Sequence, residues 1–348
     1  MKQNYIRPLD LKHGRVDMSH GSGGRAMAQL IDELFAPLLG NDYLAQGNDG
    51  SVMPLPDGPG RLVMATDAHV VSPLFFPGGD IGCLSVHGTI NDVAVMGAKP
   101  LYLSASFILE EGFALADLKR IVESMAAAAR EAGVPVVTGD TKVVEQGKGD
   151  GVFISTTGVG WLPAGIELSG NRAAAGDAIL VSGPIGDHGM AIMSQRESLA
   201  FESPIVSDTA ALHGLVADLL ASGVQVKVLR DPTRGGLGTT LNEIARQSGV
   251  GMMLQEARIP VQPAVAAACE FLGLDPLYCA CEGRLIAIVP GADKDKALAA
   301  LQAHPQGTGA AIVGSVHEDP HHFVQMTTGF GGKRIVDWLT GEQLPRIC

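Results

Sequence analysis

The sequence lacks the marks of several broad protein classes. No apolar stretch approaches the ~18 residues that a helix needs to span a bilayer, and no Lys/Arg-rich run offers a track for a nucleic-acid backbone. Asp and Glu number 37 against 25 Lys and Arg, which gives a net charge of −12. These absences argue against membrane insertion and nucleic-acid partners, and the acidic excess suits the binding of cations.

Cysteine is scarce, and no charged segment followed by an apolar segment opens the chain. The odd set of five has no second Cys/His pair at zinc spacing: Cys83, Cys269, Cys279, Cys281 and Cys348. An odd, sparse set is typical of a reduced protein rather than of a disulfide framework. We therefore predict a cytoplasmic protein whose cysteines are structural thiols, with the terminal Cys348 as the exception considered below.

The length of 348 residues suggests two domains at ~150 residues each. Residues 1–19 are polar and without a period, which predicts a mobile arm. Turn formers concentrate between Gly160 and Gly176, so we expect an N-terminal domain over 20–162 and a C-terminal domain over 163–338. Residues 339–348 are expected to form a flexible tail that carries Cys348.

Helical and strand periods alternate along both halves, which predicts an α+β fold. In the first half we expect helices over 27–38, 84–96 and 115–132, and strands over 61–66, 101–109, 134–138 and 152–159. In the second half we expect helices over 212–221, 239–247, 263–272 and 293–303, and strands over 178–182, 285–289, 311–316 and 323–327. No sequence period of 20–50 residues exists, so solenoids and propellers are disfavoured.

Four aspartates follow strand-like runs or lie among small residues in the first half: Asp49, Asp67, Asp92 and Asp140. Taken singly, each fits a turn or a helix cap as well as a ligand. Carboxylates that converge are the ligands by which Mg²⁺ is held beside substrate phosphates. As a set, they favour a metal-nucleotide site.

Two glycine-rich segments leave alternatives open. The segment 20–24 (HGSGG) precedes a helix and would offer backbone N–H groups to an anion, but it matches neither the Walker A nor the G-x-G-x-x-G pattern and fits a hinge equally well. In 230–236 (RDPTRGG), Arg230 and Arg234 are suited to grip a phosphate or carboxylate, and an Arg–Asp pair that braces the loop is at least as plausible.

The most unusual feature is the end of the chain at Cys348. A thiol on an extended tail is accessible to another protein and is able to enter a pocket, so it suits a carrier of a covalently attached group. The other readings are an accidental exposed thiol or a disulfide with a second chain. Lys142 beside a phosphate and Glu282 beside a reacting amide are suited to move protons.

Seven motifs together resemble the HypE family of hydrogenase maturation proteins, within the aminoimidazole ribonucleotide synthetase superfamily. They are HGSGG at 20–24, SPLFFPGGDIG at 72–82, NDVAVMGAKPLYLS at 91–104, TGDTKVV at 138–144, GDHG at 186–189, RDPTRGG at 230–236 and LPRIC at 344–348. The resemblance covers nearly the whole chain beyond the first 19 residues. The cysteine tail is the most specific motif, because related enzymes of the superfamily lack it.

The resemblance implies a two-domain aminoimidazole ribonucleotide synthetase-like fold, a homodimer with a β-barrel interface between N-terminal domains, and ATP with Mg²⁺ as cofactors. It implies that a carbamoyltransferase, HypF, places a carboxamide on the sulfur of Cys348. ATP-driven dehydration then yields a thiocyanate, whose cyanide passes to iron on a HypC–HypD scaffold.

The resemblance also implies residue roles. Asp49, Asp67, Asp92 and Asp140 are expected to hold Mg²⁺-ATP, with Asn91, Gly139 and Thr141 beside the nucleotide; Lys142 and Glu282 are expected to deprotonate the amide on Cys348. Phosphorylation of the amide oxygen turns it into a good leaving group, so the step needs no thiol nucleophile.

Two other functions remain to be weighed at this point. One is an ATP-dependent synthetase or kinase of the same superfamily that acts on free selenide or an aminoimidazole precursor; selenophosphate synthetases carry their reactive residue near the N-terminus, and no cysteine precedes Cys83 here. The other is an adaptor whose tail docks on a partner. Failure to bind or hydrolyse ATP in Mg²⁺ would favour the adaptor.

Overall fold

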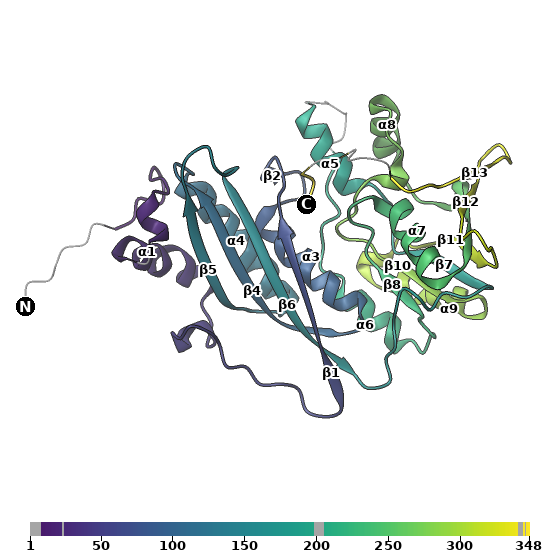
Figure 1. Ribbon diagram of the computed structural model, residues 1–348, viewed down its shortest axis with the longest axis horizontal. Helices are drawn as coiled ribbons and strands as arrows, with labels where there is room; N and C mark the ends of the chain where they lie inside the picture. Colours follow the sequence, from purple (N-terminus) through teal and green to yellow (C-terminus); the bar gives the residue numbers. More distant parts are fainter. Residues whose placement is uncertain (1–7, 23, 198–204, 340–343, 345) are drawn as a thin grey trace, which may run out of the picture.

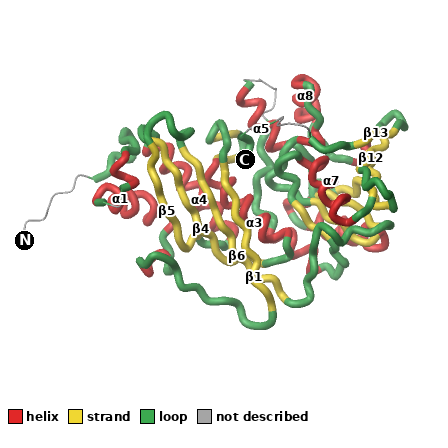
Figure 2. The backbone as a smooth tube through the Cα atoms, viewed as in Figure 1, coloured by secondary structure: helices red, strands yellow, loops and turns green. Residues whose placement is uncertain are grey.

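The computed structural model describes residues 8–22, 24–197, 205–339, 344 and 346–348. The chain forms two α+β halves side by side, each built on its own sheet (Figure 1; Figure 2). Among the described residues, no helix has the length and apolar character required to cross a membrane.

The N-terminal sheet has the order β1-β6-β4-β5. Strand β1 (Gly60–His69) is antiparallel to β6 (Val152–Pro163), β6 is antiparallel to β4 (Lys99–Glu110), and β4 is parallel to β5 (Val136–Val144). Side chains alternate between the faces, so Leu103, Ala105 and Phe107 are buried while Ile108 is 42% exposed. The sheet therefore has one covered face and one open face.

Helices α3 (Ile81–Val95) and α4 (Leu115–Ala132) pack together on the covered face of this sheet (Figure 1). Asp80 caps α3 by accepting hydrogen bonds from the backbone N–H groups of Gly82 and Cys83. The apolar stripe of α4 is buried, and the helix ends at Gly133, whose φ of 67° is the left-handed conformation that glycine adopts without strain. A short hairpin, β2 (Phe75–Phe76) and β3 (Gly79–Asp80), leads into α3.

The expected mobile arm over 1–19 is wrong for most of its length. Residues 1–7 lie outside the described residues, but Val16 is 1% exposed, and Leu9 and Leu11 pack against the N-terminal core. Arg15 pairs with Ala114 in an isolated bridge. These apolar side chains pack beside α4 without forming a helix or strand. A search for helix or strand periods therefore does not predict their burial.

The helix expected over 27–38 is present, but it changes geometry along its length. α1 (Arg25–Leu30) continues into a π-helical turn (Ile31–Phe35) and α2 (Ala36–Leu39), and the chain leaves the helix at Gly40. Short 3₁₀ turns occur at Met18–Gly21, Leu44–Gln46, Glu256–Arg258, Pro276–Tyr278, Gly291–Asp293 and Pro305–Gly307.

The C-terminal sheet has the order β13-β12-β9-β11-β7-β10-β8. Its strands are β7 (Asp177–Val181), β8 (Val228–Arg230), β9 (Gly251–Gln255), β10 (Ile286–Pro290), β11 (Ala311–His317), β12 (Val324–Thr327) and β13 (Lys333–Ile335). The helices are α5 (Asp187–Arg196), α6 (His213–Ala221), α7 (Gly236–Ser248), α8 (Pro263–Leu272) and α9 (Lys294–Ala303).

The central strands β7 and β10 of this sheet are buried on both faces. Along β7, Ile179 and Val181 pack in the core that contains α7, while Ala178 and Leu180 pack in the core that contains α6 and α9. A strand with both faces covered reads as a continuous apolar run, which is why the sequence predicts β7 and β10 well. The sequence analysis missed α5, β8, β9 and β13.

The strand expected over 134–138 is longer than predicted, because Gly139, Asp140 and Thr141 continue strand β5. A side chain at Gly139 would meet the carbonyl oxygen of Ala105 at 2.5 Å, so the glycine permits the close approach of β4. This correction decides where Asp140 and Lys142 point.

Candidate functional site

Acidic side chains from four segments gather where the two domains meet. Asp67 lies on the covered face of β1, Asp92 on α3, Asp231 directly after β8, and Glu282 on the loop before β10. Asp231 and Asp67 both act electrostatically on Asp92 and on Glu282. The sequence analysis proposed Asp67, Asp92 and Glu282 for the site but read Asp231 only as part of a braced loop.

Burial raises the pKa of these carboxyls, so they are weaker acids than exposed ones. The pKa of Asp92 rises to about 7, first through burial and then through the charges of Asp231 and Asp67, against the opposing charge of Arg230. Burial is also the main cause that raises the pKa of Asp231 to about 6. Carboxyls that gather in a partly buried place are a donor set that a divalent cation would stabilise, so the chemistry of these residues fits Mg²⁺.

Glu282 meets the end of the chain at this cluster. Its side chain is 3% exposed, and its Oε1 has no hydrogen-bond partner among the described residues. Burial raises the pKa of Glu282 well above its usual range, and Asp231, Asp208 and Asp67 add to the effect. The carboxyl hydrogen-bonds the side chain of Cys348, and burial raises the pKa of that thiol. Burial therefore favours a neutral thiol at Cys348, and the raised pKa of Glu282 makes this carboxyl a stronger base than an exposed carboxylate.

The side chain of Asn91 makes all its hydrogen bonds within the chain. Its side chain is 1% exposed, and its Nδ2 donates to the carbonyl oxygens of Ala210 at 2.9 Å and Glu282 at 3.1 Å. Its Oδ1 accepts from the N–H of Leu212 at 2.7 Å. The amide thus ties α3 to the C-terminal domain and fixes the backbone at Glu282, which leaves it no free donor for a ligand.

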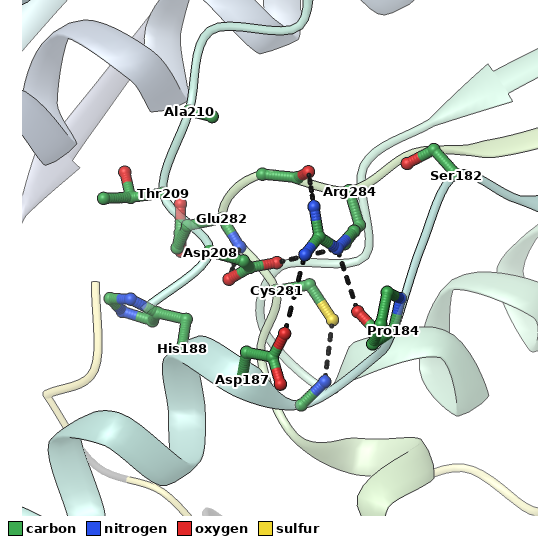
Figure 3. A network of polar contacts seen from close by, with 12 residues as sticks. Ser182, Pro184, Asp187, His188, Asp208, Thr209, Ala210, Cys281, Glu282 and Arg284 are labelled. Carbon is green, nitrogen blue, oxygen red and sulfur yellow. Dashed lines mark hydrogen bonds and ion pairs between the residues drawn. The ribbon is translucent and has the colours of Figure 1, made fainter. Parts of the chain in front are cut away.

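A second polar network, centred on Arg284, holds the loop that carries Glu282 (Figure 3). Arg284 donates to the carbonyl oxygens of Pro184 and Gly283 and pairs with Asp187 at 3.5 Å and Asp208 at 3.6 Å. Asp208 Oδ1 in turn accepts from the N–H of Glu282 at 3.1 Å. Burial and the charge of Asp208 raise the pKa of Asp187 to about 6. The loop that presents Glu282 is fixed on both sides.

Asp140 and Lys142 lie away from this cluster within one chain. The strand register aligns Asp67 with Thr156, Ala105 and Gly139 in one row, whereas Asp140 aligns with Ser106 in the next row. Adjacent rows point to opposite faces, and β1 and β5 are opposite edges of the sheet. Asp140 is therefore on the open face, where Lys142 pairs with it at 2.6 Å.

The expected single cluster of Asp49, Asp67, Asp92 and Asp140 is thus not formed by one chain. Asp49 lies in an exposed turn before β1. Across the described residues, no set of three or more His, Cys, Asp and Glu is arranged to hold a metal ion by itself. Asp67 and Asp92 are the two members of the predicted set that the structure brings together.

Gly139, Asp140 and Thr141 line a cavity of about 240 Å³ beneath the N-terminal helices. Its other walls are mostly apolar and include Met27, Ile31, Phe35, Leu39 and Phe107. A flat apolar ring such as a nucleobase fits this lining better than a charged group.

The comparisons with known proteins concern the family and the fold of the chain. Residues 47–162 match the family described as AIR synthase related protein, N-terminal domain, and residues 174–327 match the corresponding C-terminal domain. The chain is 70% identical to carbamoyl dehydratase HypE of Cupriavidus necator over 348 residues, with 100% of this chain and 99% of the relative covered.

Solved structures give the same result. A crystal structure of HypE in complex with ATP is 51% identical, has a TM-score of 0.91, and is matched over 95% of this chain and 99% of that one. A HypE–HypF complex is 48% identical with a TM-score of 0.78, matched over 89% of this chain and 99% of that one. The two-domain fold expected from the resemblance is confirmed.

Proposed function

This chain belongs to the carbamoyl dehydratase HypE family. From this premise we infer how its residues dehydrate a carboxamide carried on the tail. The chain is an ATP-dependent carbamoyl dehydratase of hydrogenase maturation. The observation that supports the residue-level proposal is the position of Cys348, whose side chain hydrogen-bonds Glu282 inside the acidic cluster.

The reaction we propose removes the elements of water from a carboxamide on the sulfur of Cys348. The amide oxygen attacks the γ-phosphorus of ATP and ADP leaves; the N–H protons are then removed and the C–O bond breaks, so that the oxygen departs on phosphate and a thiocyanate remains. The sulfur keeps its bond to carbon throughout. A neutral thiol, as the pKa of Cys348 indicates, is consistent with a carrier rather than a nucleophile in this step.

Glu282 is the residue we propose as the base for the amide proton. It lies beside the tail sulfur, and its backbone is fixed by Asn91 and Asp208. Its raised pKa brings its basicity closer to that required at neutral pH than that of an ordinary carboxylate.

Mg²⁺ is the cation we propose for Asp67 and Asp92, with Asp231 beside them. When bound, it would neutralise charge on the phosphates that receive the amide oxygen. Arg230 pairs with Glu243 at 2.7 Å, and its charge also acts on Asp92 and Asp231. Arg234 acts electrostatically on both Cys348 and His69, which places its charge at this site.

A homodimer is proposed through the open face of the N-terminal sheet. Met64 is 72% exposed and Leu62 is 57% exposed on that face, and neither edge strand, β1 or β5, has a strand on its outer side among the described residues. Large exposed apolar side chains on an unpartnered sheet are characteristic of an association surface. Asp140 and Lys142 lie on the same face, so any part they take in ATP binding or proton transfer would be at a site shared with the second copy.

The proposed partners are the carbamoyltransferase HypF, which would load Cys348, and a HypC–HypD iron scaffold, which would receive the cyanide. The solved HypE–HypF complex supports the first of these.

The test is to incubate the purified chain with HypF, carbamoyl phosphate and ATP, and to weigh its C-terminal peptide. Gain of a carbamoyl group followed by ATP-dependent loss of one water at Cys348 is expected. Cys348→Ala should abolish the gain, whereas Cys83→Ala, at the other half-buried thiol, should leave it unchanged. Modification at any other residue would contradict the proposal.

A further inference from the structure

Residues 346–348 of the tail are held in the domain interface by contacts that differ in how deeply they are buried. Ile347 is 3% exposed and belongs to the same apolar core as Leu30 and Ile81 of the N-terminal domain. The carbonyl oxygen of Arg346 accepts from the N–H of Ser72 at 3.1 Å and from the guanidinium of Arg196. The side chain of Arg346 pairs with Asp150 at the surface, where both are nearly half exposed.

His188, at the start of α5, makes the most deeply buried polar contact with the described part of the tail. Its ring is fully buried and packs edge-on against Phe76 with 5.3 Å between ring centres. Its Nε2 lies 2.8 Å from the carbonyl oxygen of Ile347, one residue before the reactive cysteine. Its Nδ1 lies 2.8 Å from the hydroxyl of Ser207. Figure 3 shows the ring beside the tail and near the loop of Glu282 and Asp208.

The neighbours of the ring determine which nitrogen carries the proton. The carbonyl oxygen of Ile347 only accepts, so Nε2 must be the donor. Ser207 Oγ accepts from the backbone N–H of Thr209 at 3.1 Å, which leaves its hydroxyl proton free to donate to Nδ1. Burial lowers the pKa of His188 and keeps the ring neutral. The imidazole is therefore a fixed donor aimed at the tail rather than a base.

We propose that His188 is a positioning residue for the tail: its Nε2–H holds the carbonyl of Ile347 and so determines how much of the time the sulfur of Cys348 lies at Glu282. The proposal rests on the proposed function in one respect, that the same sulfur has to leave this site to be loaded. A donor that stabilises only the docked tail shifts the balance between docked and free states in favour of dehydration.

The contrast with Asp150 explains why His188 and not the surface pair would set this balance. An exposed ion pair is weakened by water and salt and contributes little. Removal of a buried donor leaves the carbonyl of Ile347 without a partner in an apolar setting, which is much more costly. Two contacts with one short segment thus differ sharply in their expected effect.

The experiment measures the rate at which iodoacetamide alkylates Cys348 in the purified full chain, without ATP or HypF. His188→Leu should raise this rate by about tenfold, the scale expected for loss of one buried hydrogen bond. His188→Gln retains an N–H donor and should restore most of the protection. Asp150→Ala should change the rate by less than about twofold. Alkylation of Cys281, which is fully buried, reports any general loosening of the fold.

A second readout separates loading from chemistry. In His188→Leu, carbamoylation of Cys348 by HypF should proceed at least as fast as in the unaltered chain, while dehydration of the carbamoylated tail should slow. Equal alkylation rates in His188→Leu and the unaltered chain would overturn the proposal, as would the same increase in His188→Gln or a parallel increase at Cys281. These outcomes concern only tail docking, so they can be distinguished from failure of the dehydration itself.

Discussion

Two acidic regions of the N-terminal domain look alike in sequence and differ in the folded chain. Asp92 lies buried near Asp67 and Asp231, and its pKa rises to about 7. Asp140 lies on the open face of the sheet, where the hydrogen bond and charge of Lys142 lower its pKa. Burial and the sign of the nearest charge, rather than the local motif, decide which carboxyl requires a cation.

The largest expected effect is at the buried cluster. Asp92→Asn should lower Mg²⁺-dependent ATP turnover by the carbamoylated chain at least about 100-fold, because it removes a charged ligand from the proposed metal site. Phosphate release measures this effect, with Asp117→Asn on the exposed side of α4 as the control. Full turnover in Asp92→Asn would remove Asp92 from the metal site and weaken the comparison.

The next effect concerns the support of the buried region. Asn91→Ala should lower the free energy of unfolding by about 3 kcal/mol, because the N–H of Leu212 and the carbonyl oxygens of Ala210 and Glu282 lose buried partners. Urea unfolding measures this loss. Asn171→Ala, at an exposed position, should change stability by less than about 0.5 kcal/mol. A small loss in Asn91→Ala would show that water replaces the amide.

The pH dependence of the free energy of unfolding also distinguishes buried from exposed carboxyls. The pKa of Asp187 is raised from 3.8 to about 6, so the folded chain holds a proton that the unfolded chain has released. Its contribution to stability is therefore present at low pH and is lost as the pH rises through 4 to 6, with a slope of up to about 1.4 kcal/mol per pH unit.

Asp187→Asn should reduce that slope when the free energy of unfolding is measured by urea at several pH values. The intercept is expected to change as well, because Arg284 loses an ion-pair partner. Superimposable slopes in the two proteins would show that Asp187 is ionised in the fold at low pH.

The smallest effect is expected at the exposed pair. Lys142→Met should change the free energy of unfolding by less than about 0.5 kcal/mol, since the side chains of Lys142 and Asp140 are 62% and 57% exposed. A loss as large as that of Asn91→Ala would mean that the open face is covered in solution, and repeating the measurement at dilutions that separate a dimer would identify the second copy as the cover.

The sequence predicts well those elements that have a regular apolar pattern or a residue that ends a helix. The stripe of α4 with Gly133 after it, and the continuous apolar run of β7, identify their elements without tertiary information. The site was only partly predictable for a physical reason. Which face of the sheet Asp67 and Asp140 lie on depends on the register of four strands. The sequence of β1 or β5 alone does not contain that register.

Long-range contacts were the other limit. His188 Nε2 contacts the carbonyl oxygen of Ile347, 159 residues further along the chain, and no local pattern connects the two. The charge of Asp231 acts on Asp92 and Glu282, which lie far from it in the sequence. A local motif does not contain such contacts.

The burial of Ile347 has a consequence for how the chain folds. This side chain completes an apolar core whose other members include Val16, Leu30 and Leu118, so residues from opposite ends of the printed sequence must meet before that core is fully packed. Contacts of such high sequence separation form late and slowly. The N-terminal domain is therefore expected to reach its final rigidity only after the C-terminal domain has folded and carried the tail back to it, which makes docking of the tail the closing step of folding as well as a step of the reaction.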